Sequence, residues 1–221
     1  MFLRQLTRTI VIGATAIVVV AVVAFPAEIS AQGARGNGGS NARSGPAAGG
    51  VAGTVDSVST SSFAVLTAAG QNVTIQEAPS TEYQKGTNSI PASALTKGDS
   101  VLVLGIVNGR SITASQVIVQ PADKGGSATS SAAGVIPFQH GAPSAAKQVG
   151  QVPANYSQGS GTIVSGTEAN KATEAALANY PGGIVDRVVE LSNGEYEVHN
   201  IGVNWPHHIF VSRDFKVVGA F

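Results

Sequence analysis

Residues 95–119 read LTKGDSVLVLGIVNGRSITASQVIV, and this stretch decides the fold of the first half of the chain. Lys97-Gly98-Asp99 predicts a tight turn, and the apolar run that follows, to Val107, predicts a strand covered on both faces. Asn108-Gly109 is a strong two-residue hairpin signal, because both positions tolerate a positive φ angle. Residues 113–119 are expected to form the returning strand.

Residues 51–120 continue this pattern on either side of the stretch. Alternating apolar positions predict further strands around 55–58, 63–67 and 73–75, and no segment here has a helical period. Five or six short strands in 70 residues predict a small closed or nearly closed β-barrel. Closure removes the strand edges that would otherwise pair between molecules.

The motifs of residues 51–120 resemble an exported bacterial family of OB-like barrels that is known only as a domain of unknown function. The matching positions are Gly53, Val55, Phe63, Leu95, Gly98, Asp99, Val101, Gly105, Ala114 and Val117. Nearly all of them are structural glycines or core positions, so the resemblance implies a fold and no chemistry. OB-like barrels often bind oligonucleotides or oligosaccharides. This sequence lacks the aromatic pairs and the Lys/Arg groove of a single-strand binder, so we expect no nucleic-acid partner.

The composition excludes several classes of function. Thirteen Lys and Arg residues balance 13 Asp and Glu residues, and charged residues make up 12% of the chain. Without a basic excess, a large nucleic-acid footprint is not expected. The chain contains no cysteine, which excludes disulfides, thiolate zinc sites, iron–sulfur clusters and a cysteine nucleophile. No motif indicates a cofactor, and we expect none.

The N-terminus has the pattern of an export signal. Arg4 and Arg8 precede an unbroken run of 16 apolar or small residues from Ile10 to Phe25, and a small-residue cleavage site ends at Ala31. Crossing a membrane takes about 20 residues. We therefore favour a cleaved signal peptide at residues 1–31 over an uncleaved N-terminal membrane anchor. Both interpretations place the rest of the chain outside the cytoplasm, secreted or held at the cytoplasmic membrane by this segment alone.

Two low-complexity tracts divide the remaining chain. Residues 32–50 have almost no apolar side chain larger than alanine, which predicts a Gly-rich flexible tether. Residues 121–166 are rich in Gly, Ser, Ala and Pro and predict a mostly irregular linker, in which residues 135–138 could dock locally. A linker of this length is typical of domains that move independently.

Residues 167–221 predict a second unit. Ser165 or Thr167 can cap a helix over 168–180, which Pro181 ends. The expected buried face of this helix consists of Ala169, Ala172, Ala176 and Tyr180, with Leu177 beside it. Strands are expected at 184–191, 195–200, 209–213 and 215–219. One helix across an antiparallel meander is the expected architecture.

Residues 172–200 and 209–219 resemble PepSY-like domains. The resemblance rests on an Ala-rich helix that ends in Pro-Gly, a Gly-Xaa-Tyr-Glu-Val strand and a closing strand around an acidic residue. The matching positions are Ala175, Ala176, Pro181, Gly182, Val185, Val188, Gly194, Tyr196, Glu197, Val198, Val211, Asp214 and Val217. The resemblance implies an exported binding or regulatory module, in some relatives an inhibitor of peptidases, and it implies no catalytic residues.

Residues 202–208 read GVNWPHH and depart from the PepSY-like pattern. His207 and His208, together with His199, are weak candidates for divalent metal ligands. Adjacent histidines on a strand point to opposite faces, so at most one of the two would join His199. We favour ordinary surface or edge histidines and no metal site.

Two aromatic side chains are candidates for contact with a partner. Trp205 is either a core residue, which we favour, or an exposed anchor for a partner or a sugar. Tyr196 is the second candidate contact. Glu195 and Glu197 share one face of a strand and are interpreted as a solvated face.

The sequence thus predicts an α+β multidomain protein in which a small antiparallel OB-like β-barrel and a PepSY-like helix-plus-meander domain are joined by a flexible linker. Because no acid, base and nucleophile converge in the pattern, we expect a non-enzymatic cell-envelope protein with a binding or regulatory role through protein or polymer contacts. The alternatives are a modulator, such as an inhibitor, of an extracytoplasmic peptidase, a hydrolase, and a passive spacer. We expect a monomer whose partner is an envelope protein or a glycan.

Overall fold

The computed structural model describes residues 45–120, 136–137, 148–154 and 156–221. The expected signal or anchor segment lies outside these residues, as do most of the expected tether and much of the expected linker. Among the described residues, no helix is both long enough and apolar enough to cross a membrane.

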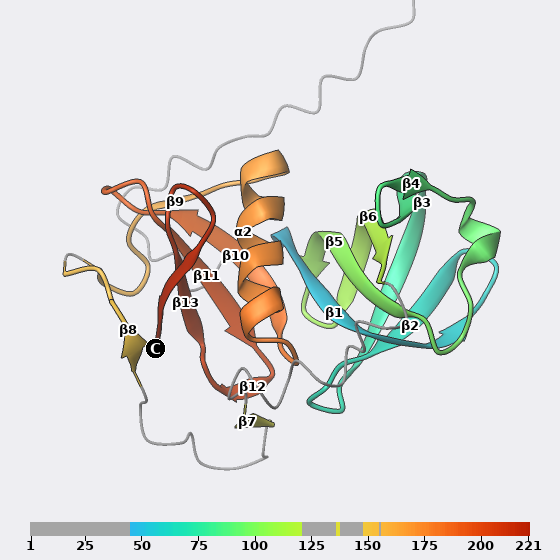
Figure 1. Ribbon diagram of the computed structural model, residues 1–221, viewed down its shortest axis with the longest axis horizontal. Coiled ribbons are helices and arrows are strands. Elements are labelled where there is room, and N and C mark those ends of the chain that lie inside the picture. The colour runs from blue at the N-terminus through green and yellow to red at the C-terminus, as the bar shows by residue number, and fades with distance from the viewer. Residues whose placement is uncertain (1–44, 121–135, 138–147, 155) are drawn as a thin grey trace, which may run out of the picture. The chain divides into compact units, whose positions relative to one another are not determined.

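Five strands close into a small barrel (Figure 1). They are β1 (Ala47–Val58), β2 (Ser62–Leu66), β3 (Asn72–Lys85), β5 (Ser100–Asn108) and β6 (Ser111–Val119). Their order is β1-β2-β3-β6-β5, and β5 pairs with β1 to close the ring. The expectation of a purely antiparallel barrel was wrong in one respect, because β3 and β6 are parallel. The chain between them forms β4 (Asn88–Ser89), a 3₁₀ turn (Ala92–Ala94) and β5, and β6 then lies between β5 and β3.

The burial of β5 on both faces was predicted, and the structure supplies the reason. Val101 and Val103 point into the interior of the barrel, whereas Leu102 and Leu104 belong to a second hydrophobic cluster outside it. The hairpin to β6 is also present. Its turn lies one residue later than predicted, because Asn108 is the last residue of β5 and the turn residues are Gly109, with φ +60°, and Arg110.

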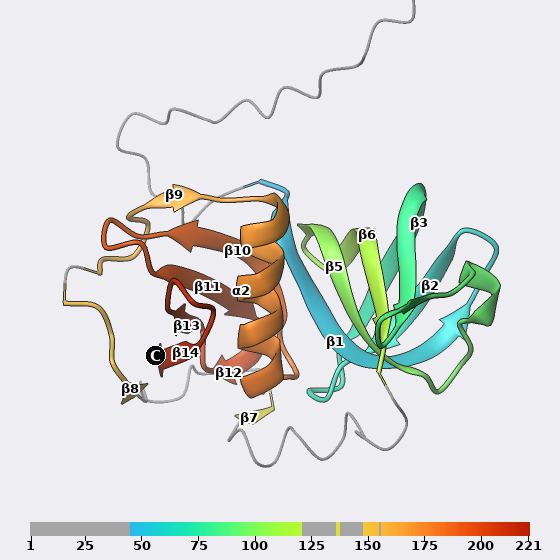
Figure 2. The ribbon, with the colours of Figure 1, turned by 45° about the horizontal axis from the view of Figure 1, so that its top comes forward.

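Strand β1 is shared between the barrel and a second sheet. Gly50 and Val51 pair with Val185 and Ile184 of β10 (Ile184–Glu190), while the other edge of β1 pairs with β5 (Figure 2). The strand begins at Ala47, so the last four residues of the expected tether belong to it.

Beyond β10, the sheet continues as the expected antiparallel meander. The strands follow in the order β10, β11 (Tyr196–Ile201), β13 (His208–Val211) and β14 (Val217–Ala220). The only α-helix among the described residues, α2 (Gly166–Asn179), packs on β1, β10, β11 and β13. It starts after Ser165, although the Ser165 side chain makes no capping hydrogen bond.

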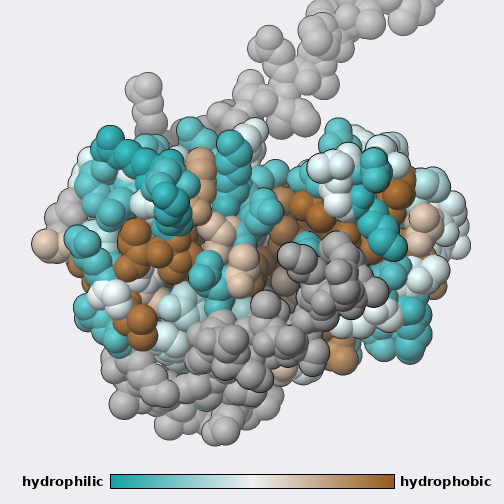
Figure 3. Space-filling model, viewed as in Figure 1, coloured by the Kyte–Doolittle hydropathy of each residue, from teal (hydrophilic) through white to brown (hydrophobic). Residues whose placement is uncertain are grey.

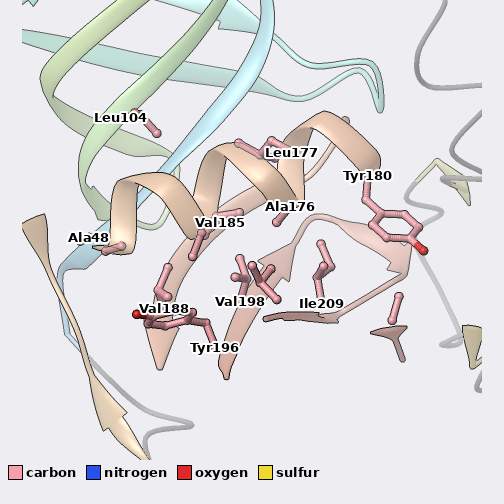
Figure 4. Close-up of a cluster of buried hydrophobic side chains, with 14 of the residues drawn as sticks. Ala48, Leu104, Ala176, Leu177, Tyr180, Val185, Val188, Tyr196, Val198 and Ile209 are labelled. Carbon is pink, nitrogen blue, oxygen red and sulfur yellow. The ribbon is translucent and has the colours of Figure 1, made fainter. Parts of the chain in front are cut away.

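The helix packs through the alanine face that the sequence predicts (Figure 4). Beneath it lie Val185, Val188, Val198 and Ile209. The residues that β1 and β5 add to this cluster are Ala48, Leu102 and Leu104, and β10 adds Ile184 to the cluster inside the barrel. The two expected units therefore share a sheet and a hydrophobic core, and the described residues lie within one compact unit.

Parts of the expected linker also pair with the second half of the protein. β7 (Ile136–Pro137) pairs with β12 (Val203–Trp205), β8 (Val149–Gly150) with β14, and β9 (Thr162–Ile163) with β10. We call residues 149–160 the covering segment, with residue 155 outside the described residues. Residues 121–135 and 138–147 of the expected linker lie outside the described residues.

Candidate functional site

A groove of about 780 Å³ lies on the barrel beside β3. It forms where β3 leaves the register of β6. Glu77 pairs with Ala114, but the next pair joins Glu82 to Gln116, so β3 carries extra residues over this stretch. The strand pattern is interrupted here by Pro79, which has no N–H to give to a sheet.

Hydrogen bonds hold the extra residues in place. The Thr81 hydroxyl donates to the Ala114 carbonyl at 2.7 Å and accepts from the Ala78 N–H at 2.8 Å. Thr81 thus bridges the gap between the two strands, where a regular ladder would have used backbone groups. The groove is therefore a defined part of the barrel wall.

The lining of the groove is mostly polar. It contains five hydroxyl side chains besides a tyrosine, namely Thr60, Ser61, Thr81, Thr87 and Ser89. Two carboxylates, Glu77 and Glu82, and the amide of Gln84 complete the polar lining. The lining includes no Lys, Arg or His. Such a surface offers donors and acceptors for a hydroxyl-rich ligand, but it has no positive charge to hold an anion.

Glu77, one of the two carboxylates of the groove, is held in place by a buried tyrosine. The Tyr83 hydroxyl donates a hydrogen bond to Glu77. Burial raises the pKa of Tyr83 well above its ordinary value, and the hydrogen bond and negative charge of Glu77 raise it further. The phenol therefore keeps its proton at neutral pH and remains a donor to Glu77.

The three candidate histidines lie together on the face of the second sheet that points away from α2. His199 and His208 are direct cross-strand partners, with ring centroids 5.2 Å apart. The His207 ring lies 6.3 Å from the His199 ring. Both His207 and His208 therefore lie near His199. The expectation that adjacent histidines point to opposite faces was wrong here, because His207 precedes the first residue of β13 and does not follow the strand period.

Each of two histidines is paired with a carboxylate. The His208 Nδ1 atom lies 2.7 Å from Glu197, and the His199 Nδ1 atom lies 2.6 Å from Asp186. Nδ1 carries the proton in both pairs, since a bare nitrogen facing a carboxylate oxygen at this distance would be repelled. Among the described residues, no group of three or more His, Asp or Glu side chains is arranged to hold a metal ion.

The expected solvated face of Glu195 and Glu197 was wrong for Glu197, which is 2% exposed. The reason is the covering segment, which lies over this side of the sheet. Its Tyr156 hydroxyl lies 3.1 Å from the His208 Nδ1 atom, and the Tyr156 ring packs edge-to-face on Phe210 at 4.9 Å. Burial and the negative charge of Glu197 raise the pKa of Tyr156.

The two candidate partner contacts lie in the core. Trp205 and Tyr196 are each 6% exposed, and both belong to the cluster beneath α2. Trp205 packs edge-to-face against Tyr180 at 5.5 Å, and Tyr196 stacks on Phe215. The structure places both side chains in the packing of the helix against the sheet and not on a contact surface.

Apolar surface does not mark another site. The large hydrophobic residues exposed among the described residues are Val58, Leu66, Ile106, Val149, Ile163 and Phe221. On the face drawn in Figure 3, hydrophobic residues form small patches separated by hydrophilic ones. The groove on the barrel is therefore the best candidate for binding.

Comparison with known families bears on the barrel. Residues 52–118 match a protein family described as a domain of unknown function (DUF5666). A DUF5666 domain is present. Its matched residues run from β1 to β6 and contain the whole lining of the groove, so the groove belongs to the DUF5666 domain. The comparison with curated proteins gave no match, and neither did the comparison with solved structures.

Sequence reasoning missed the groove, although a local signal for it exists. Residues 77–82 read EAPSTE and interrupt the alternation that residues 73–75 establish. A proline inside an otherwise regular strand is typical of a bulge or an edge. The carboxylates at the two ends of this interruption are the charged groups of the groove.

Proposed function

We propose that this protein is an exported, non-enzymatic cell-envelope protein that binds a hydroxyl-rich polymer, such as a glycan, in the groove of its DUF5666 domain. The observation that carries the proposal is the groove itself, an open hollow beside β3 lined by hydroxyls, carboxylates and an amide. Pockets of roughly 300–1,000 Å³ are of the size that holds small ligands or short segments of a polymer.

A binding role without catalysis is supported by the chemistry of the lining. Glycosidases use a pair of carboxylates, one of them held as an acid in an enclosed apolar setting. Here Glu77 is already engaged by the Tyr83 hydroxyl and Glu82 is exposed, so the two carboxylates of the groove lack that setting, and no histidine or lysine lines the groove. A nucleic-acid partner is disfavoured for the same reason, because single-strand binders use cationic grooves with exposed aromatic rings.

Export and the PepSY-like character of residues 167–221 are parts of the same proposal. Export is supported by the basic and apolar leader between Arg4 and Phe25. The PepSY-like assignment is supported by the helix α2 lying across an antiparallel meander of four strands. In this proposal the second half of the protein supports the barrel through the shared strand β1.

Binding can be tested with residues 32–221 and neutral oligosaccharides, namely six-sugar oligomers of glucose and of N-acetylglucosamine, by calorimetry. The variant Ser61→Tyr places a ring in the groove at an exposed lining position. Ser80→Tyr is the matched control, since Ser80 is exposed and next to the groove but does not line it. We expect binding that Ser61→Tyr abolishes and that Ser80→Tyr leaves intact.

The same experiment separates the alternatives. Shortened oligosaccharides after incubation would indicate a hydrolase and contradict a non-enzymatic role. If no oligosaccharide binds and the protein changes the activity of an added secreted peptidase, the peptidase modulator replaces our proposal. If neither happens, the protein is a spacer.

A further inference from the structure

The groove of the DUF5666 domain carries negative charge without any compensating cation. Glu77 and Glu82 are its two carboxylates, and its lining contains no Lys or Arg. Neither carboxylate forms an ion pair with another described residue, whereas Asp56 on the same barrel pairs with Lys97 at 3.3 Å. A ligand that enters the groove therefore meets an uncompensated negative potential.

The two carboxylates occupy defined positions. Glu77 is the last residue of β3 paired with β6 before the register jump, and Glu82 is the first paired residue after it. Glu77 is half-buried and receives the Tyr83 hydroxyl, whereas Glu82 is exposed. The pair thus stands at the two ends of the extra residues, with the hydroxyls of the lining around them.

The kind of ligand follows from this inventory. Hydroxyl and amide side chains bind neutral sugar hydroxyls, and they do so equally well for charged and uncharged glycans. The carboxylates add a preference, because they attract ammonium groups and repel carboxylates, sulfates and phosphates. Resting on the proposed glycan-binding function, we propose that the groove selects an amine-bearing glycan, one with free ammonium groups on its sugars.

The test compares two probes that differ only in this charge. Residues 32–221 are titrated with a six-sugar oligomer of glucosamine and with the N-acetylated oligomer of the same length, at about pH 6, where amines are protonated. We expect the glucosamine oligomer to bind about tenfold more tightly at low salt. The preference should shrink when the ionic strength is raised to several tenths molar, because exposed charges are screened there.

A charge-removing variant assigns the preference to the groove. Glu82→Gln should lower the affinity for the glucosamine oligomer about two- to fivefold and leave the N-acetylated oligomer unaffected, as expected for an exposed ion pair. Glu174→Gln on the exposed face of α2 removes the same charge away from the groove and is the control. Thermal melting checks that both variants are folded.

The outcomes separate the two proposals. Equal affinity for both oligomers overturns the amine preference and leaves glycan binding standing. No binding of either oligomer, or tighter binding of a polyuronate, overturns the amine preference, and the first of these results also counts against the proposed function. A preference that is undiminished in Glu82→Gln, or that falls as far in Glu174→Gln as in Glu82→Gln, overturns the assignment to the groove.

Discussion

Replacing Gly49 by alanine tests whether β1 joins the barrel to the second sheet. A Cβ atom at Gly49 would lie 2.0 Å from the Val185 carbonyl oxygen and 3.2 Å from a methyl group of Val107. The first contact is with backbone, so β1 and β10 must move apart. Overpacking of this kind costs about 1–3 kcal/mol. We expect the upper end, about 3 kcal/mol, which for a protein of this size lowers Tm by roughly 6–12 °C.

The assay is thermal unfolding followed by circular dichroism and by the fluorescence of Trp205, the only tryptophan of the chain. Trp205 lies in the cluster to which β1 contributes Ala48, so its fluorescence should fall in the same shifted transition as the circular dichroism. Gly45→Ala is the matched control, because nothing lies within 4 Å of a Cβ there. An unchanged Tm for Gly49→Ala would refute the close approach of β1 and β10.

Three further changes test the polar contacts. Glu197→Ala removes the acceptor of the buried His208 and should lower the free energy of unfolding, measured in urea, by about 3–5 kcal/mol. The control Glu195→Ala should lower it by less than about 1 kcal/mol. Similar losses for both variants would contradict the burial of Glu197. The pKa of His207 is lowered, chiefly by burial, from its ordinary value of 6.5. His207 therefore makes its full contribution to stability above pH 6.5, and the contribution is lost as the pH falls from that value toward the lower pKa of the folded protein. His207→Gln should flatten the pH dependence of the free energy of unfolding between about pH 7 and 5. Tyr83→Phe leaves Glu77 without its donor and should destabilise the barrel by about 1–3 kcal/mol, and a neutral effect in chemical unfolding would argue against that hydrogen bond.

Local patterns predicted the elements whose partners lie nearby in sequence. The hairpin between β5 and β6 and the buried face of α2 at Ala169, Ala172 and Ala176 follow from turn chemistry and helical period. These features need only a few neighbouring residues. The bounds of β2, β5 and β6 were predicted within about two residues, whereas β1 begins at Ala47 and β3 extends to Lys85, well beyond the predicted strands at 55–58 and 73–75.

The features that sequence reasoning missed depend on distant segments. The burial of Glu197 requires the covering segment. Its Tyr156 contacts His208, which lies 52 positions further along the chain. The parallel pairing of β3 with β6, and the groove that it opens, arise from the closure of the barrel and have no periodic signature.

The sharing of β1 has a consequence for how the chain assembles. Ala47 pairs with Val107, and Gly50 pairs with Val185, 135 positions further along. β1 is therefore synthesised before the other described strands but is among the last to be paired along both edges. Contacts between such distant positions slow folding, because a long loop must close before any pairing energy is gained. The barrel can close once residue 119 is available, but the edge of β1 at Gly50 and Val51 has no partner strand until residues 184 and 185 follow.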